Sequence, residues 1–278
     1  MNSTDFTKLY HSRCIEDSGK HKPHFWMPQA IKPTPFTLFG SSNLSVMPEW
    51  RVEKTIGKIL ALNLNLELPV GDFIDAATKR DLPDLPGLKL LLKSNISDEA
   101  RHYKGFEYAV EAYSVDPLDL KEAKIIAAAW NQKMEYYHPV LLATALEIKI
   151  FLVALGCLRL FGGAELARMA RKISEDEFRH TKTNRSLLIE LGIDGYTLPS
   201  DIEQLVSDTL YWLVCDLNLE GKAVYSDRNF IDYQFLQQAS DQLMTYGYAP
   251  EFDELVFCAD DAAPFEVDNA KLYDREIA

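Results

Sequence analysis

Cysteine is scarce in this chain of 278 residues, which contains only four. They lie far apart in the sequence and form no Cys-x-x-Cys pair, which argues against a zinc ribbon. Such cysteine usage is typical of a reducing compartment, and we expect a cytoplasmic location. The sequence also lacks a Gly-rich phosphate loop and an alternation of strand and helix patterns, which argues against the common nucleotide-binding folds.

Basic residues are also fewer than acidic residues. Lysine and arginine number 29 against 42 aspartate and glutamate residues, which gives a net charge of −13. Nucleic-acid-binding proteins need a basic surface, and anionic membranes attract basic segments. The charge balance therefore argues against a nucleic-acid or membrane partner. The first residues, MNSTDFTKLYHSRC, show no basic-then-apolar pattern, so we expect no export signal.

Long hydrophobic runs are limited to one segment, Val140 to Leu158. It is long enough to cross a membrane, but it carries Glu147 and Lys149 near its centre. Each of these charges would cost about 2.5–3.5 kcal/mol in the middle of a bilayer. We therefore expect this segment to be a helix buried inside a soluble protein.

The spacing of apolar residues from Trp50 onward predicts helices and no strands. Pro69 and Gly71 are expected to end the first of these helices. The expected helices cover residues 50–68, 87–114, 118–137, 139–161, 164–191, 202–219 and 230–246. The prediction is an all-α protein with one domain over 1–278, divided into an irregular N-terminal arm at 1–48, a main bundle at 50–192, accessory helices at 193–248 and an acidic tail at 249–278.

A five-residue signature, Asp-Glu-x-Arg-His, occurs twice, at residues 98–102 and 176–180. Positions i and i+3 share one face of a helix. Glu99 and His102 therefore point the same way, as do Glu177 and His180. A carboxylate and an imidazole placed in this way can bind the same metal ion, as in the dinuclear sites of helix bundles.

A third Glu-x-x-His pair, Glu135 and His138, lacks the accompanying Asp and Arg. It also lies next to Pro139, at the expected end of a helix. We interpret it as a coincidence of spacing.

Dinuclear sites of this kind need one further Glu from each of two other helices. Glu147 lies in the most apolar helix, where an ionised carboxylate is costly unless it is paired or bound to a metal. A buried Arg partner is the alternative explanation for Glu147. Glu67 lies in the run Leu-Asn-Leu-Asn-Leu-Glu-Leu and precedes Glu99 by 32 residues, while Glu147 precedes Glu177 by 30. The matched lengths indicate an internal duplication.

The signature and its spacing resemble those of the ferritin-like, non-haem di-iron carboxylate proteins. The resemblance covers about residues 50–192 and implies a ferritin-like four-helix bundle with additional peripheral helices. It also implies that Asp98 and Asp176 each accept a hydrogen bond from a ligand histidine of the other half, with Arg101 and Arg179 balancing their charge. The alternative for both arginines is a surface salt bridge. The ligand set that the resemblance implies is Glu67, Glu99, His102, Glu147, Glu177 and His180.

This family implies an O2-dependent oxidoreductase, either an oxygenase or an oxidase, that acts on a small organic substrate. Two iron ions are the implied cofactor, and a manganese–iron pair suits the same ligands. No flavin, nicotinamide or iron–sulfur motif is present, so an electron donor such as a ferredoxin or a reductase is the expected partner. The candidate substrate-lining residues, each of which can also be ordinary core, are Phe106, Ala143, Phe151, Ile173 and Thr181.

Two other functions remain open within this family. The first is that of the radical-generating small subunit of ribonucleotide reductase, which usually has a tyrosine four residues after the first ligand histidine. Phe106 occupies that position here, and the chain is short for that group. The second is iron storage with ferroxidase activity. Bundles of this kind commonly form homodimers, and the sequence leaves the oligomeric state open.

Overall fold

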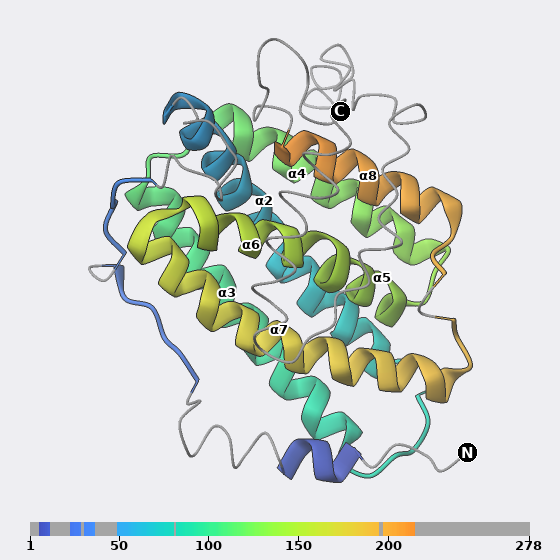
Figure 1. Cartoon of the computed structure of the whole chain (residues 1–278). Helices are drawn as coiled ribbons and strands as arrows, with labels where there is room; N and C mark the ends of the chain where they lie inside the picture. Colours follow the sequence, from blue (N-terminus) through green and yellow to red (C-terminus); the bar gives the residue numbers. More distant parts are fainter. Residues whose placement is uncertain are drawn as a thin grey trace, which may run out of the picture.

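The computed structural model describes residues 6–11, 23–28, 31–36, 49–80, 82–194 and 197–214. These residues form helices and connecting segments and contain no strand, so the all-α prediction is confirmed for them. A short helical segment at 6–11 precedes the main helices. The main helices are α2 (Glu49–Thr78), α3 (Leu88–Ala112), α4 (Pro117–Gln132), the 3-10 helix η2 (Lys133–Glu135), α5 (Pro139–Ala145), the π-helix η3 (Leu146–Phe151), α6 (Leu152–Phe161), α7 (Gly163–Leu191) and α8 (Ser200–Val214), most of which are labelled in Figure 1.

Local sequence signals set several of the helix ends. Helix α4 begins after Asp116, whose Oδ1 accepts a hydrogen bond from the backbone N–H of Leu118 at 2.9 Å. An Asp at this position satisfies one of the unpaired amides of the first turn. Helix α7 ends at Gly192, which has a φ of 68°. This left-handed conformation is the usual C-terminal stop and favours glycine.

Helix α2 is longer than the sequence predicts. Pro69 lies inside it, and the helix continues to Thr78. The prediction that it ends near Leu68 was therefore wrong. A proline inside a helix costs about 3 kcal/mol, but the second half of α2 buries a row of apolar side chains that includes Val70, Phe73 and Ile74. Their burial, at about 1.5–3 kcal/mol for each large side chain, outweighs the local cost of the proline.

The apolar segment after Pro139 is divided into three parts instead of one continuous helix. Its middle part is the π-helix η3, and all six of its residues are buried, including Glu147. The stretch Pro139–Arg159 has the length and hydropathy of a membrane span, but its apolar window is buried inside the protein. It therefore behaves as a core helix, as the sequence predicts, while the local widening at Glu147 was not predicted. π-Helical turns of this kind are frequent at functional sites.

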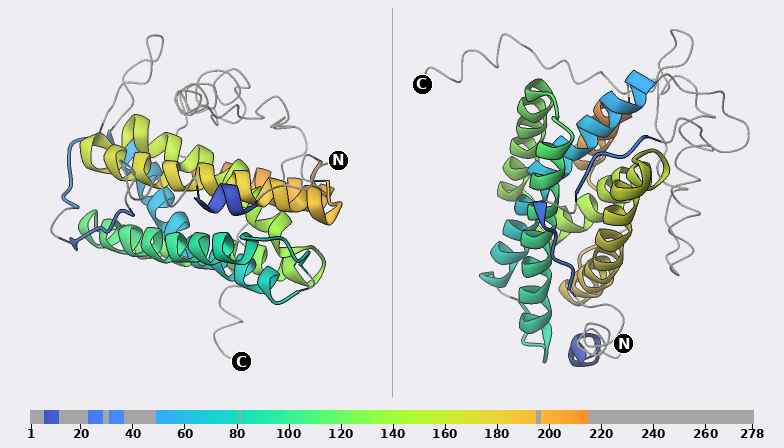
Figure 2. Two further views of the ribbon diagram at one scale, coloured as in Figure 1. Left: turned by 90° about the horizontal axis from the view of Figure 1, so that it is seen from below. Right: turned by 90° about the vertical axis from the view of Figure 1, so that its left-hand side faces the viewer.

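The helices pack as neighbouring antiparallel pairs. Helix α2 packs mainly on α3, and α6 packs on α7. Gly71 of α2 faces Glu99 of α3, whereas Gly57, further toward the start of α2, lies beside Tyr113 at the end of α3. Helices α2 and α3 therefore run in opposite directions. Helices α3 and α7 also contact each other, and Figures 1 and 2 show them side by side. Their contact brings the two copies of the signature face to face.

The described parts of the N-terminal arm lie across α3 and α7. The backbone N–H of Thr34 donates to the hydroxyl of Tyr113 at 3.3 Å, and that hydroxyl donates to the carbonyl of Lys32 at 3.4 Å. Trp26 is buried against Gly105 of α3 and Met169 of α7. Figure 2 shows the described part of the arm passing between α3 and α7.

Parts of the predicted organisation lie outside the described residues. These are the end of the helix predicted over 202–219, the helix predicted over 230–246 and the acidic tail at 249–278. The division of the chain into arm, bundle, accessory helices and tail stays a prediction.

Candidate metal centre

The predicted ligands come from four helical segments and meet inside the protein. Every one of these side chains is buried, and the most accessible, Glu177, is only 6% exposed. Carboxylates are rarely found at such depth unless they are paired or bind a metal. The segments that supply them are α2 (Glu67), α3 (Glu99 and His102), η3 (Glu147) and α7 (Glu177 and His180).

These side chains form two groups that share two members. The first group contains Glu67, Glu99, His102 and Glu177, and the second contains Glu99, Glu147, Glu177 and His180. Within each group, one potential ligand atom from every residue lies within 4.8 Å of the others. Glu99 and Glu177 belong to both groups. The arrangement is compatible with a dinuclear metal centre in which these two carboxylates bridge.

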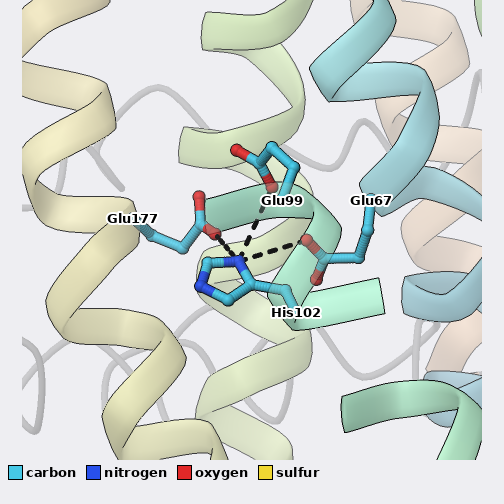
Figure 3. A group of neighbouring side chains, drawn as sticks. All are labelled: Glu67, Glu99, His102 and Glu177. Carbon is cyan, nitrogen blue, oxygen red and sulfur yellow. Dashed lines mark ion pairs between the residues drawn. The ribbon is translucent and has the colours of Figure 1, made fainter. Parts of the chain in front are cut away.

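His102 forms the centre of the first group, shown in Figure 3. Its Nδ1 lies 3.1 Å from Oε1 of Glu177, 3.3 Å from Oε2 of Glu67 and 3.6 Å from Oε2 of Glu99. These carboxylates approach from α7, α2 and α3, so three helices converge on one imidazole nitrogen.

His180 has the same role in the second group. Its Nδ1 lies 2.8 Å from Oε1 of Glu99, 3.6 Å from Oε2 of Glu177 and 3.9 Å from Oε1 of Glu147. Glu99 and Glu177 thus each turn one oxygen toward His102 and the other oxygen toward His180. Two carboxylates that each present one oxygen to His102 and one to His180 have the geometry that a pair of bridging ligands requires.

The outer nitrogens of the two histidines make a crossed pair of hydrogen bonds. Nε2 of His102 lies 3.1 Å from Oδ2 of Asp176, and Nε2 of His180 lies 3.1 Å from Oδ2 of Asp98. An ionised carboxylate only accepts, so Nε2 carries the hydrogen in both rings. In a neutral ring, Nδ1 is then left with its lone pair directed at the glutamates. This is the crossed arrangement that the resemblance implies.

The charge of the two aspartates is compensated locally. Arg101 forms an ion pair with Asp98, and Arg179 forms one with Asp176. Both arginine side chains are mostly covered, at 13% and 16% exposure. With the aspartates paired in this way, the four buried glutamates would carry four negative charges when fully ionised, which two divalent cations would neutralise.

Burial and mutual charge shift the pKa values of these side chains in opposite directions. Burial raises the pKa of Glu67 and of Glu147 well above the usual range. Burial also opposes ionisation of Glu99, but His180 and His102 outweigh it and lower the pKa of Glu99 to about 2. For His180, burial disfavours the charged ring, yet Glu99 and Glu177 raise its pKa to about 10.

Unsatisfied polar atoms mark the place where a metal would fit. Both oxygens of Glu67, Glu99 and Glu177, together with Nδ1 of His102 and of His180, are buried and lack a hydrogen-bond partner among the described residues. Such atoms are rare in folded proteins because each costs about 1–3 kcal/mol. Here they converge, and a set of carboxylate oxygens and imidazole nitrogens suits iron or manganese.

The other residues predicted for the site also lie in the interior. Phe106, Ala143, Phe151 and Ile173 are fully buried, and Thr181 is 4% exposed. Their contact with a substrate stays a prediction. By contrast, Glu135 is exposed and His138 caps α5 by accepting a hydrogen bond from the backbone N–H of Val140, so this third Glu-x-x-His pair lies outside the cluster.

Two residues of the site were missed by the sequence reasoning. Nδ2 of Asn184 donates to Oε2 of Glu147 at 2.9 Å and to Oε1 at 3.1 Å. Asn184 lies four residues after His180, so helical spacing offered a signal for it. The ring of Trp26 lies edge-on to His102, with centroids 6.2 Å apart. Trp26 belongs to the irregular arm, and no local pattern links it to α3.

Comparisons of the chain with models of known families, with curated proteins and with solved structures find no match.

Proposed function

We propose that this protein is a dioxygen-activating, non-haem dinuclear iron oxidoreductase. Its fold would be a ferritin-like four-helix bundle in which α2, α3, α7 and the continuous segment α5–η3–α6 surround the metals. Helix α4 and helix α8 would be peripheral. This proposal combines the resemblance of the repeated signature with the convergence of all the implied ligands at one buried place.

One observation carries the proposal. The two groups of potential ligands share Glu99 and Glu177, and these carboxylates turn opposite oxygens toward the two histidines. A site for a single ion would need neither the second histidine nor the fourth carboxylate. Two ions held by this set would each have one terminal Glu and one His, and they would share the carboxylates of Glu99 and Glu177.

The residues of the chain would have separate roles in this chemistry. A pair of ferrous ions, when bound, supplies two electrons for the reduction of O2. Asp176 and Asp98 hold the two imidazole rings in the orientation that directs Nδ1 inward. The surrounding apolar core excludes water from the centre. Iron, or a manganese–iron pair, suits the ligands, and a ferredoxin or a reductase would return the electrons between turnovers.

The substrate would be a small, partly apolar organic molecule. Three side chains close to the ligands in sequence, Phe106, Phe151 and Ile173, are apolar and buried. They offer no charged group for recognition of an ionic substrate. An oxygenase or an oxidase is therefore the function that we favour.

A specific observation also bears on the radical-generating alternative. Trp26 packs its ring against His102, and its Nε1 is buried without a hydrogen-bond partner among the described residues. An oxidisable indole beside a metal ligand gives a short path for an electron. Phe106, at the position of the usual radical tyrosine, cannot hold a phenoxyl radical. We therefore place this function second.

Metal content per chain is the measurement that tests the proposal. The purified protein is loaded anaerobically with Fe(II) and Mn(II) together, exposed to O2 while its optical spectrum is recorded, and analysed by mass spectrometry. We expect about two metal ions per chain and a new charge-transfer band. Glu99→Ala and Glu177→Ala are expected to lose both ions while keeping the helical circular dichroism spectrum.

Glu135→Ala is the matched control, because Glu135 belongs to the Glu-x-x-His pair outside the cluster. It is expected to retain both ions. Retention of two ions by Glu99→Ala and by Glu177→Ala would contradict the proposal. Growth of a ferric mineral far beyond two ions per chain would favour iron storage instead, and a mixed manganese–iron pair would favour the radical-generating function.

A further inference from the structure

The two terminal glutamates of the cluster have different surroundings. Both oxygens of Glu67 lack a hydrogen-bond partner among the described residues. Both oxygens of Glu147, by contrast, accept from the same nitrogen, Nδ2 of Asn184, at 3.1 and 2.9 Å. The two halves of the cluster are therefore alike in their ligands and unlike in the groups that contact those ligands.

The near-equal distances locate the amide nitrogen of Asn184. An atom at 3.1 Å from one carboxylate oxygen and 2.9 Å from the other lies close to the line that bisects the carboxylate. This is the edge on which a carboxylate chelates a metal through both oxygens. The N–H of Asn184 occupies that edge in Glu147, while the corresponding edge of Glu67 carries no such donor.

The distances to the histidines agree with this difference. Oε2 of Glu67 lies 3.3 Å from Nδ1 of His102, whereas Oε1 of Glu147 lies 3.9 Å from Nδ1 of His180. Glu147 is also carried by the π-helix η3, and Glu67 by the regular helix α2. Glu147 is thus held further from its histidine.

The repeated signature allows the two halves to be compared position by position. Asn184 lies four residues after His180, on the same helix face and fully buried. The residue four positions after His102 is Phe106, which is also fully buried but has no hydrogen-bond donor. The Asp, Glu, Arg and His of the signature are the same in the two halves.

We propose that Asn184 makes the two metal positions unequal. By occupying the chelating edge of Glu147, it limits this glutamate to one coordinating oxygen, while Glu67 has both available. The position at Glu67 and His102 then binds the first ion more tightly. The position at Glu147 and His180 then binds the second ion more weakly. This inference rests on the proposed dinuclear centre.

Stepwise loading with Mn(II) alone, without O2, tests the inference. Isothermal titration calorimetry and electron paramagnetic resonance report the two binding steps. In the natural protein we expect two steps whose affinities differ by at least about tenfold. In crystals of protein loaded with one ion per chain, the anomalous signal of manganese is expected beside His102.

Two reciprocal variants identify the cause of the difference. Asn184→Leu frees the chelating edge of Glu147 and is expected to strengthen the second step by about tenfold, so that the two affinities converge. Phe106→Asn introduces an amide at the equivalent position of the first half and is expected to weaken the first step. Phe106→Leu, which introduces no donor, is the control and should leave both steps unchanged.

Each outcome separates this inference from the proposed function. Two ions that bind with equal affinity, or a first ion located beside His180, overturn the inference and leave the dinuclear centre intact. A second step that Asn184→Leu weakens by about 10- to 100-fold also overturns it, because Asn184 would then only orient Glu147. Binding of fewer than two ions by the natural protein overturns both the inference and the proposed function.

Discussion

Nε2 of His102 lies 3.1 Å from Oδ2 of Asp176, which belongs to the opposite copy of the signature. Asp176 immediately precedes Glu177, so one short stretch of α7 contributes a candidate ligand and also orients the ligand of α3. His180 and Asp98 repeat this relationship in the other direction. Neither half of the cluster is therefore complete without the other.

Exchange of Asp176 for Asn tests this dependence. The Asp176→Asn variant keeps the size of the side chain but removes the charge that holds the hydrogen on Nε2 of His102. We expect affinity for the ion beside His102 to fall about 10- to 100-fold, which is the usual effect of losing such a partner. Asp98→Asn should have the same effect beside His180. Mn(II) titration followed by electron paramagnetic resonance measures both.

Glu165→Gln is the control for these variants. Glu165 also lies on α7 and forms an ion pair with an arginine three residues away, Arg168, but both side chains are partly exposed and outside the cluster. Its removal should leave the metal affinity unchanged. Equal losses in Glu165→Gln and Asp176→Asn would show that the effect comes from the net charge of the helix and not from orientation of His102.

Metal removal is expected to lower the stability of the fold. A ligand that binds only the folded state stabilises it by about 2.7 kcal/mol when its free concentration is about 100 times its Kd. The metal-free cluster also keeps unsatisfied buried atoms, such as both oxygens of Glu67. Thermal melts with and without a chelator should therefore differ by several degrees in the natural protein. The same comparison in Glu177→Ala should show no difference.

The sequence could predict those parts of the centre that depend on local spacing. The pairs Glu99–His102 and Glu177–His180 share a helix face at i and i+3, and helical geometry alone places their side chains together. Glu147 could be found because an acid within an apolar run needs a partner. The helices at residues 88–112 and 163–191 were likewise predictable from the period of their apolar residues.

Features that depend on tertiary packing could not be predicted in this way. Pro69 is a helix breaker by local propensity, and only the burial of the second half of α2 keeps that helix continuous. The π-helix at Glu147 lies in an apolar segment whose sequence pattern predicts a regular α-helix. Trp26 contacts His102 although the two residues lie more than 70 positions apart in the sequence. The segment around Trp26 has no helical or strand periodicity from which this contact could be predicted.

Metal affinity is expected to rise with pH. In the metal-free protein, burial raises the pKa of Glu67 and of Glu147. Burial acts against a proton on His180, but Glu99 and Glu177 outweigh it and raise the pKa of His180 to about 10. A raised pKa favours the protonated form of each group, and a metal ion competes with that proton. Affinity should therefore increase from about pH 6 to about pH 8.

Calorimetry in buffers of different ionisation enthalpy checks this pH dependence. The slope against buffer enthalpy gives the number of protons released for each ion bound. We expect net release, and Glu147→Gln should release fewer protons than the natural protein. Affinity that stays constant or falls with rising pH would contradict the expected competition between protons and metal.

The contact between Trp26 and Gly105 provides the last prediction. A Cβ atom added to Gly105 would lie 2.9 Å from Cδ2 and Cε3 of Trp26 and 3.2 Å from Cε of Met169. The indole must then shift from its place against His102, and such overpacking typically costs about 1–3 kcal/mol. Gly105→Ala should therefore lower the free energy of unfolding and move the fluorescence emission to longer wavelength. The emission shift should be absent when Trp26 is also replaced by Phe.

Gly57→Ala is the matched control, since Gly57 also lies inside a helix. A Cβ atom at that position would meet only Oδ2 of Asp119, at an ordinary contact distance of 3.5 Å. Alanine is favoured over glycine in a helix by up to about 1 kcal/mol, so this variant should be as stable as the natural protein or more stable. A loss of stability in Gly57→Ala equal to that in Gly105→Ala would mean that helix α3 has no special requirement for glycine beneath Trp26. A selective loss at Gly105 would instead show that the N-terminal arm is held against the candidate metal centre by a contact that only glycine permits.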